Sequence, residues 1–489
     1  MSNAPEQPPA PMRRANRVLA IVSVSQLVSV INASAMAVVA PAAALDLNAD
    51  LPTAQWFVLG TFLAIAAFLV PAGRMGDQIG RKPLYIVGFV LLVIGNLVSA
   101  TAGAAGGVIL GRLAVGLGAA MQQGNSLPLL MTVFPSDRRA SVIAFQVSVV
   151  GIGGVLGPFL GGLIVDAYGW RSLFYISVVL GAGMVVISAL GLERRAERTP
   201  VAWSDFDWAG ATLSATFLIT VMTALTLAPR RGWTDTGIAI GFAVSALLFG
   251  AFLWRETRTK DPMLRLSLFR LSAIAIGSAA SLSLFMSASA MRFLIPFHLQ
   301  FVQGYSARDV GFVLVPSALA LIVVSPFAGR LADRLGPRRV ANAGLVAVLI
   351  AVLALTSINE LTSIWLSTAY VMLVGVAMSI FHAPNGASMI NSVQPNEHGV
   401  ASAILSLSRN LGNVLGIALA TVIVTAVMAR AGVSPTLEPA ELAASPARQL
   451  AFIEGMHTVF VIFACVVFSM VLVSLWRARD ASPVSEKNH

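Results

Sequence analysis

Four basic side chains stand within long apolar stretches of this sequence. They are Arg112, Arg292, Arg409 and His382. Inside a membrane such groups are costly, and they mark candidate pathways for substrates or protons. Arginine keeps its proton, so it can bind an anion but cannot release a proton. Histidine titrates near neutral pH, which makes His382 a candidate proton carrier, with Asp46 and Asp77 as alternatives. The competing roles are structural, because an arginine can reach toward lipid headgroups and a lone histidine can simply bridge helices.

Uncharged amides in the same stretches can hydrogen-bond a substrate or bridge helices. Among them we place Asn32 and Gln122 on the substrate and proton pathway, together with the four basic residues. No Asp or Glu lies near the middle of an apolar stretch. A water-filled cavity lined by the arginines and free of carboxylates would repel organic cations. We therefore expect neutral or anionic amphiphiles as substrates.

The apolar stretches dominate the chain. Of its 489 residues, 57% are hydrophobic and 11% are charged, against about 25% charged in soluble proteins. About 20 apolar residues suffice for a helix to cross the ~30 Å hydrocarbon core of a bilayer. The sequence predicts an all-α polytopic membrane protein with fourteen transmembrane helices. Their expected ranges are 17–42, 53–73, 83–104, 107–132, 139–165, 171–192, 207–229, 236–254, 270–298, 309–329, 338–357, 361–385, 399–428 and 456–476.

A glycine-rich charged motif occurs twice, 256 residues apart. The first copy contains Gly73, Asp77, Gly80, Arg81 and Lys82, and the second contains Gly329, Asp333 and Gly336. We expect each copy to be a loop between two helices, because glycine permits a tight turn. An aspartate there can bind the positive N-terminal end of a helix in the other half of the molecule. Such a contact would form and break as one mouth of a cavity closes and opens, so these residues are gating candidates. The alternative is a basic loop that serves topology alone.

A second motif lies in the expected fifth helix. It comprises Gly153, Gly157, Pro158, Gly161 and Gly162. Small residues at every fourth position let membrane helices approach closely, and a proline removes a backbone hydrogen bond and kinks the helix. The tripeptide Val-Leu-Gly that ends at Gly157 recurs at Gly416, 259 residues later.

The two repeats predict two six-helix halves with two extra helices inserted between them. We expect an N-terminal tail (1–16), a first half (17–192), a linker with the two extra helices (193–269), a second half (270–477) and a C-terminal tail (478–489). Parallel halves of this kind are a transporter architecture. Twenty-three of the 32 Lys and Arg residues fall on one side of this arrangement. The positive-inside rule then predicts that both termini are cytoplasmic.

The charge distribution, the cysteine count and the absence of two common motifs argue against several other classes of function. The net charge of +10 sits in short loops between apolar stretches, so no nucleic-acid partner is expected. The single cysteine, Cys465, allows no disulfide and no cysteine metal site within one chain. The chain has no phosphate-binding Gly-Lys-Ser/Thr loop and no His-Glu-x-x-His motif. We therefore expect no cofactor, no metal and no enzymatic activity.

Both charged loops resemble the signature between helices 2 and 3 of the major facilitator superfamily. The segment around Gly157 and Pro158 resembles the motif of its antiporter members. Fourteen helices, the segment 206–210 that opens the first extra helix and the segment 299–306 before the tenth helix resemble the drug:proton antiporter branch. The resemblance spans residues 17–477, and it implies a proton-coupling role for the fourth-helix arginine, Arg112.

The sequence departs from that branch at three positions. Asn32 stands where the branch usually has an aspartate, Val115 replaces the usual glutamine three residues after Arg112, and Gln78 replaces a frequent basic residue. These changes leave the fold untouched and affect the coupling chemistry.

The resemblance implies a proton-coupled exporter of hydrophobic drugs or antibiotics that works by alternating access. The alternative is a lipid or metabolite carrier of the same fold, not coupled to protons. Expected partners are a hydrophobic small molecule, protons and membrane lipids. We expect a monomer in the cytoplasmic membrane of a bacterium.

Overall fold

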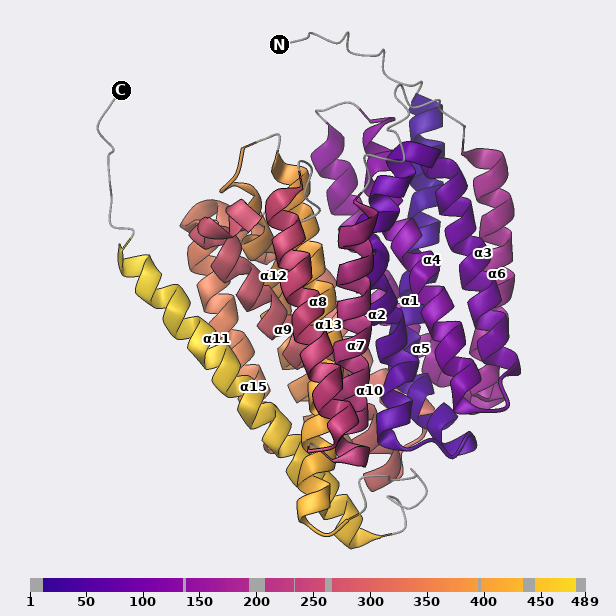
Figure 1. Ribbon diagram of the computed structural model, residues 1–489, viewed down its shortest axis with the longest axis vertical. Coiled ribbons are helices and arrows are strands. Elements are labelled where there is room, and N and C mark those ends of the chain that lie inside the picture. Colours follow the sequence, from indigo (N-terminus) through magenta and orange to yellow (C-terminus); the bar gives the residue numbers. More distant parts are fainter. Residues whose placement is uncertain are drawn as a thin grey trace.

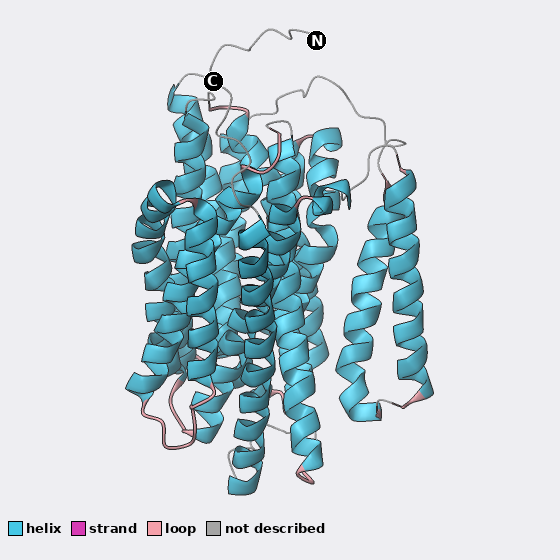
Figure 2. Ribbon diagram, turned by 90° about the vertical axis from the view of Figure 1, so that its left-hand side faces the viewer, coloured by secondary structure: helices cyan, strands magenta, loops and turns pink. Residues whose placement is uncertain are grey.

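The computed structural model describes residues 12–134, 138–192, 207–232, 234–259, 266–394, 397–433 and 445–480. The expected tails and the linkers around the extra helices therefore lie partly outside the described residues. Within the described part the chain is helical and has no strand (Figure 2). Fourteen of its helices are long and apolar enough to cross a membrane, as the sequence predicts.

The helices run side by side and alternate in direction (Figure 1). The first six are α1 (Met12–Asp46), α2 (Leu51–Ile79), α3 (Arg81–Thr101), α4 (Ala105–Met131), α5 (Arg139–Tyr168) and α6 (Trp170–Gly191). The two inserted helices are α7 (Trp208–Arg231) and α8 (Thr236–Arg258). The last six are α9 (Ser272–Phe297), α10 (Ala307–Leu335), α11 (Pro337–Leu355), α12 (Ile364–Ile390), α13 (His398–Arg430) and α15 (Pro446–Asp480). A helix satisfies its own backbone hydrogen bonds, which is what a lipid environment requires. We call the side on which α1 begins the terminal side, and the other the opposite side.

The two charged motifs are largely helical, unlike the loops expected from hydropathy. α2 continues to Ile79 and α10 continues to Leu335. Each helix then turns at a single glycine with positive φ, at 96° for Gly80 and 90° for Gly336. The expected ends were too early because charged residues end the apolar window at the membrane surface without ending the helix. The equal geometry of the two turns extends the sequence repeat to the backbone.

The second repeat also has a structural counterpart. A Cβ added at Gly157 would lie 2.9 Å from the carbonyl oxygen of Ile31 in α1, and one at Gly416 would lie 2.2 Å from that of Met286 in α9. Gly153 and Gly412, one turn earlier, face the same two helices. The pairs α1–α5 and α9–α13 therefore pack in equivalent ways, each with its backbones almost touching.

The other face of α5 packs against α10 of the second half. Near the opposite side, a Cβ added at Gly162 would lie 2.6 Å from the carbonyl oxygen of Ala307, and one at Gly311 would lie 2.6 Å from that of Pro158. These contacts close the α5–α10 seam toward the opposite side. On the terminal side a Cβ added at Gly329 would have no atom within 4 Å among the described residues, so this face of α10 makes no such close contact there, although Ala328 and Ala332 are buried.

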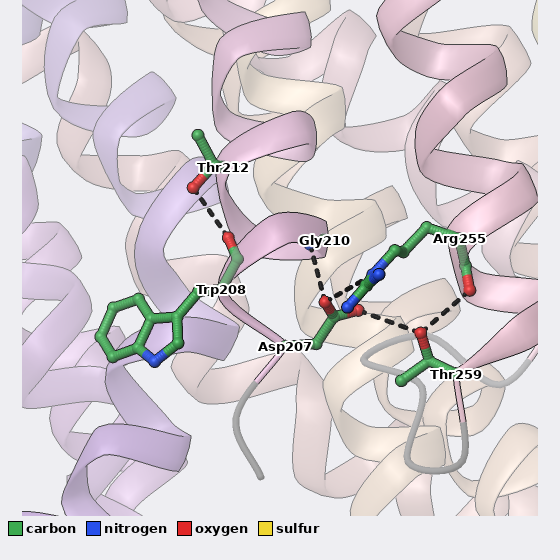
Figure 3. A network of polar contacts seen from close by, with 6 residues as sticks. All are labelled: Asp207, Trp208, Gly210, Thr212, Arg255 and Thr259. Atoms are coloured by element: carbon green, nitrogen blue, oxygen red, sulfur yellow. Dashed lines mark hydrogen bonds and ion pairs between the residues drawn. The ribbon is translucent and has the colours of Figure 1, made fainter. Parts of the chain in front are cut away.

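The inserted helices α7 and α8 form a hairpin at one side of the bundle (Figure 2). α7 packs against α2 and α13, and α8 packs against α7. The carboxylate of Asp207 joins the two helices at the terminal side, because it accepts hydrogen bonds from the backbone N–H of Gly210 and from Arg255, each at 2.9 Å (Figure 3). The Thr259 hydroxyl adds a longer contact at 3.4 Å. These bonds hold the terminal-side ends of α7 and α8 together.

The close approach of α9 and α13 leads to a first prediction. Gly416→Ala should lower the free energy of unfolding by about 1–3 kcal/mol, because its methyl group would meet backbone atoms that cannot rotate away. The thermal unfolding midpoint of the purified protein measures the effect. Gly183→Ala in α6 is the matched control, since nothing lies within 4 Å of a Cβ there. Equal unfolding midpoints for the two variants would contradict the packing argument.

Candidate functional site

A cavity of about 310 Å³ lies between the two halves, at mid-height of the bundle. Eight of its wall helices form four pairs from equivalent positions of the two halves, namely α1 and α9, α2 and α10, α4 and α12, and α5 and α13, and α3 completes the wall. The lining reaches Tyr85, about one turn from the terminal-side end of α3, and Ser126 of α4. Toward the opposite side it is bounded by residues that include Pro158 and Leu314, at the closed α5–α10 seam. The cavity therefore extends from the middle of the membrane toward the terminal side.

The second half supplies the charged part of this wall. Arg292 of α9 and Arg409 of α13 both line the cavity. Arg292 donates a hydrogen bond of 3.3 Å from Nη2 to Oδ1 of Asn413. No Asp or Glu is among the lining residues, and neither arginine forms an ion pair within the described part of the chain. The cavity therefore carries uncompensated positive charge.

His382 lies behind the same wall rather than in it. Its ring packs edge-on against Phe285, with centroids 5.3 Å apart, and Phe285 lines the cavity. Nδ1 of His382 is buried and has no hydrogen-bond partner among the described residues. Phe285 therefore contacts both the cavity and the ring of His382.

Arg112 is fully buried inside the first half and does not line the cavity. Its Nη1 donates a hydrogen bond of 2.9 Å to Oδ1 of Asn32. The guanidinium carbon lies 6.0 Å from the ring centroid of Phe174, within reach of a cation–π attraction. Nε and Nη2 of Arg112 have no hydrogen-bond partner among the described residues. The amide of Asn32 is thus the hydrogen-bond acceptor that holds this buried cation.

The orientation of the Asn32 amide is fixed by its neighbours. Asn96 donates from Nδ2 to the carbonyl oxygen of Leu92 at 2.8 Å, so its Oδ1 must accept. Asn32 donates from Nδ2 to that Oδ1 at 2.8 Å and to the hydroxyl of Ser177 at 2.9 Å. Its own Oδ1 then faces Arg112. An aspartate at position 32 would have no N–H for Asn96, so this network is built for an amide.

Gln122 is the sequence-predicted amide that does line the cavity. Its Oε1 accepts a hydrogen bond of 2.5 Å from the hydroxyl of Ser29. Nε2 is buried and has no partner within the described part of the chain. This donor is available to an acceptor group of a bound molecule.

The candidate gating residues lie at the terminal side. Lys82 donates hydrogen bonds to the carbonyl oxygens of Ala189 and Leu192, which cap the end of α6 in the same half. Asp333 is exposed. The side chain of Asp77 lies outside the described residues. Gly73 contacts Gly124 of its own half.

The sequence reasoning missed the residues that complete each polar group. Asn96 and Ser177 orient Asn32, Ser29 orients Gln122, and Phe285 shields His382. Asn96 had a usable signal, because it is a polar residue in the middle of an apolar stretch. The others are common residue types in membrane helices, and only their position in space marks them.

The segment 299–306 has a structural task. The chain leaves α9 through a π-helical turn, His298–Val302. Gln303 then donates from Nε2 toward the carbonyl oxygens of Asn359, Glu360 and Thr362, at 3.3, 3.2 and 2.8 Å. It thereby fastens the α11–α12 connection on the opposite side.

Comparison with known sequences identifies the class of protein that this fold and cavity define. The sequence model of the Major Facilitator Superfamily matches residues 22–297 and again 277–489. The chain belongs to the Major Facilitator Superfamily. It is a secondary transporter, and not an enzyme.

Relatives with known roles include exporters and resistance proteins. The chain is 31% identical over 390 residues to the multidrug resistance protein Stp of Mycobacterium tuberculosis, covering 79% of this chain and 70% of that protein. It is 27% identical over 407 residues to the tetracenomycin C resistance and export protein of Streptomyces glaucescens, covering 82% and 74%. The riboflavin transporter RibZ of Clostridioides difficile is 25% identical over 404 residues, covering 82% and 86%.

Solved structures agree with the fold. A bacterial homologue of the human lysosomal transporter Spinster superposes with a TM-score of 0.68 at 16% identity, covering 97% of this chain and all of that one. A POT family peptide transporter superposes with a TM-score of 0.66 at 16% identity, covering 97% and 99%.

The buried amide network leads to a second prediction. Asn32→Leu should lower the free energy of unfolding by about 2–3 kcal/mol, because Arg112 would lose its hydrogen-bond acceptor in a buried site. Thermal unfolding of the purified protein measures this, and Asn391→Leu at the exposed end of α12 is the control. Asn32→Asp should fall between the wild type and Asn32→Leu, since its carboxyl group still accepts from Arg112 but offers no N–H to Asn96. If Asn32→Leu unfolds at the wild-type temperature, Asn32 does not hold Arg112.

Proposed function

We propose that this transporter exports hydrophobic small molecules such as drugs or antibiotics by alternating access, with neutral and anionic compounds favoured over cations. The single observation that carries this proposal is a central cavity lined by Arg292 and Arg409 and by no carboxylate among the described residues. Positive charge in a low-dielectric cavity attracts anions and excludes cations. Relatives named as a multidrug resistance protein and a tetracenomycin C resistance and export protein support export as the direction.

The proposed orientation places the terminal side in the cytoplasm of a bacterium, with the protein a monomer in its cytoplasmic membrane. The distribution of Lys and Arg supports this orientation. The cavity then extends toward the cytoplasm, so a compound enters from the cytoplasm or from the inner leaflet. Closure of that mouth is the step in which the two charged motifs, with Asp77 and Asp333, would contact the opposite halves.

We further propose that an inward flow of protons drives export. Arg112 cannot carry the proton, and its partner Asn32 has no carboxyl group to carry it. His382 is the proposed carrier, because its ring is one side chain away from the cavity and its Nδ1 is free of other bonds within the described part. Arg112 acts in this scheme as a fixed charge.

The alternative function is a lipid or metabolite carrier that is not coupled to protons. The amide at position 32 favours it, since this buried network contains no group that can exchange a proton. The likeness to the riboflavin transporter RibZ also supports a metabolite as substrate.

A transport assay separates these functions and is the third prediction. Everted membrane vesicles are acidified inside and monitored with a pH-quenched dye, and amphiphiles of each charge type are added in turn. Neutral and anionic compounds should dequench the dye by drawing protons out, and cationic analogues should not. His382→Gln should abolish dequenching, because glutamine keeps hydrogen bonding but does not titrate.

His457→Gln is the matched control, since His457 lies at the α11–α15 contact outside the cavity and binds the carbonyl oxygen of Ile358. Dequenching that survives in His382→Gln would remove His382 as the proton carrier. A cationic compound as the best substrate would overturn the charge argument. Movement of a labelled compound with no dequenching would establish the uncoupled carrier instead.

A further inference from the structure

The two walls of the central cavity differ in charge. The first half contributes uncharged polar side chains, and the second half contributes cations and amides. The polar lining of the first half includes Gln26, Ser29, Gln122, Gln123 and Ser126. The polar lining of the second half includes Arg292, Arg409, Asn410 and Asn413. The electrostatic potential in the cavity is therefore more positive at the second-half wall than at the first-half wall.

The two arginines both lie on the second-half wall of the cavity. Arg292 reaches from α9 to Oδ1 of Asn413 on α13. Arg409 lies four residues before Asn413, and residues four apart share a face of a helix about one turn from each other. Both guanidinium groups therefore belong to the same wall of the cavity, where an anion would meet positive charge without a carboxylate partner among the described residues.

Both arginines retain unused donors. Arginine presents five N–H groups in a planar fork that matches a carboxylate. Arg292 uses one donor for Asn413, and no hydrogen bond or ion pair within the described residues involves the side chain of Arg409. Phe285 and Phe293 of α9 line the same cavity and give it an apolar surface beside the charges.

The facing wall carries a donor of a different kind. Gln122 is 3% exposed, and Ser29 fixes its amide by donating to Oε1. Nε2 consequently remains as a neutral donor without a partner in the described part of the chain. It matches an uncharged acceptor such as a carbonyl or ether oxygen.

We propose that the central cavity binds amphiphilic acids in one orientation, with the acidic group between Arg292 and Arg409 and an uncharged acceptor at Gln122. This inference rests on the proposed export of neutral and anionic compounds and narrows it to a substrate class. The substrate carries one acidic group, a flat apolar body and a carbonyl or similar acceptor away from the acid. The cavity volume of about 310 Å³ lies at the small end of ligand sites, which suits a compact aromatic acid.

Four probes on one tricyclic scaffold test the proposal. They are anthraquinone-2-carboxylate, its uncharged analogue 2-(hydroxymethyl)anthraquinone, its trimethylammonium analogue, and anthracene-2-carboxylate, which has the acid but no carbonyl on the middle ring. Binding is measured by titration calorimetry on the full chain in nanodiscs of zwitterionic lipid, with empty nanodiscs subtracted. The acid should bind about tenfold or more tightly than the alcohol, as expected for charge-assisted hydrogen bonds.

Substitutions in the cavity test which residues bind the acidic end of the probe and which bind its carbonyl. Arg409→Gln and Arg292→Gln should each weaken binding of the two carboxylate probes about tenfold and leave binding of the alcohol unchanged. Arg409→Lys should weaken the carboxylates less than Arg409→Gln, because it keeps the charge and loses the fork. Gln122→Leu should weaken binding of anthraquinone-2-carboxylate and leave binding of anthracene-2-carboxylate unchanged. Arg258→Gln, at the exposed end of α8, is the control for loss of one positive charge.

Four outcomes would overturn the proposal. The first two are equal binding of the acid and the alcohol, or no binding of the acid. The third is that Arg258→Gln lowers the affinity for anthraquinone-2-carboxylate as much as Arg409→Gln does. An equal effect of Gln122→Leu on both carboxylates would overturn the orientation. The proposed function fails separately, when the vesicle assay shows no transport of neutral or anionic compounds or when the trimethylammonium probe binds best.

Discussion

Backbone contact between glycine-bearing helices is the constraint on which this structure depends. Lipid is as apolar as the helices, so burial of apolar surface does not hold them together, and close packing must do so. α5 meets α1 through Gly153 and Gly157 and meets α10 through Gly162. The first contact joins α5 to its own half, and the second joins it to the other half. Because α13 meets α9 in the same way as α5 meets α1, both halves are built on the same helix packing.

The packing of each half decides where its charges lie. Arg112 is buried inside the first half, where Asn32 accepts its hydrogen bond. Arg292 and Arg409 lie on the wall that the second half contributes to the cavity. The network at Asp207 keeps a further carboxylate at the terminal-side end of α7 and far along the chain from the cavity residues. The cavity is thus positive because the acids of the described chain are outside it and because two of three membrane arginines face it.

The sequence was sufficient for the fourteen helices, since each is long, apolar and separated from the next by polar residues. Their ends were less predictable: α15 begins at Pro446 rather than near 456, because a helix can continue past the apolar window into polar surroundings. Asn32, Arg112 and Gln122 could be singled out as candidates because they are polar residues within apolar stretches. Which of them faces the cavity could not be predicted, because helices that are apolar all round give no periodic signal for the buried face. The partners Ser29 and Ser177 come from other helices, and only the packed structure brings them together.

The amide at position 32 links these points. A carboxylate there would neutralise Arg112 when ionised and would release that neutralisation when protonated, so the first half would change its net charge during a transport cycle. The amide keeps the charge constant, because it does not titrate. The bond from Asn96 to Leu92 fixes the Asn96 oxygen as the acceptor of the Asn32 N–H. In the proposed exporter the group that changes charge is His382 of the second half, whose ring packs against Phe285 of the wall that also carries the two arginines. In such an arrangement an anionic substrate and a proton act on the same wall.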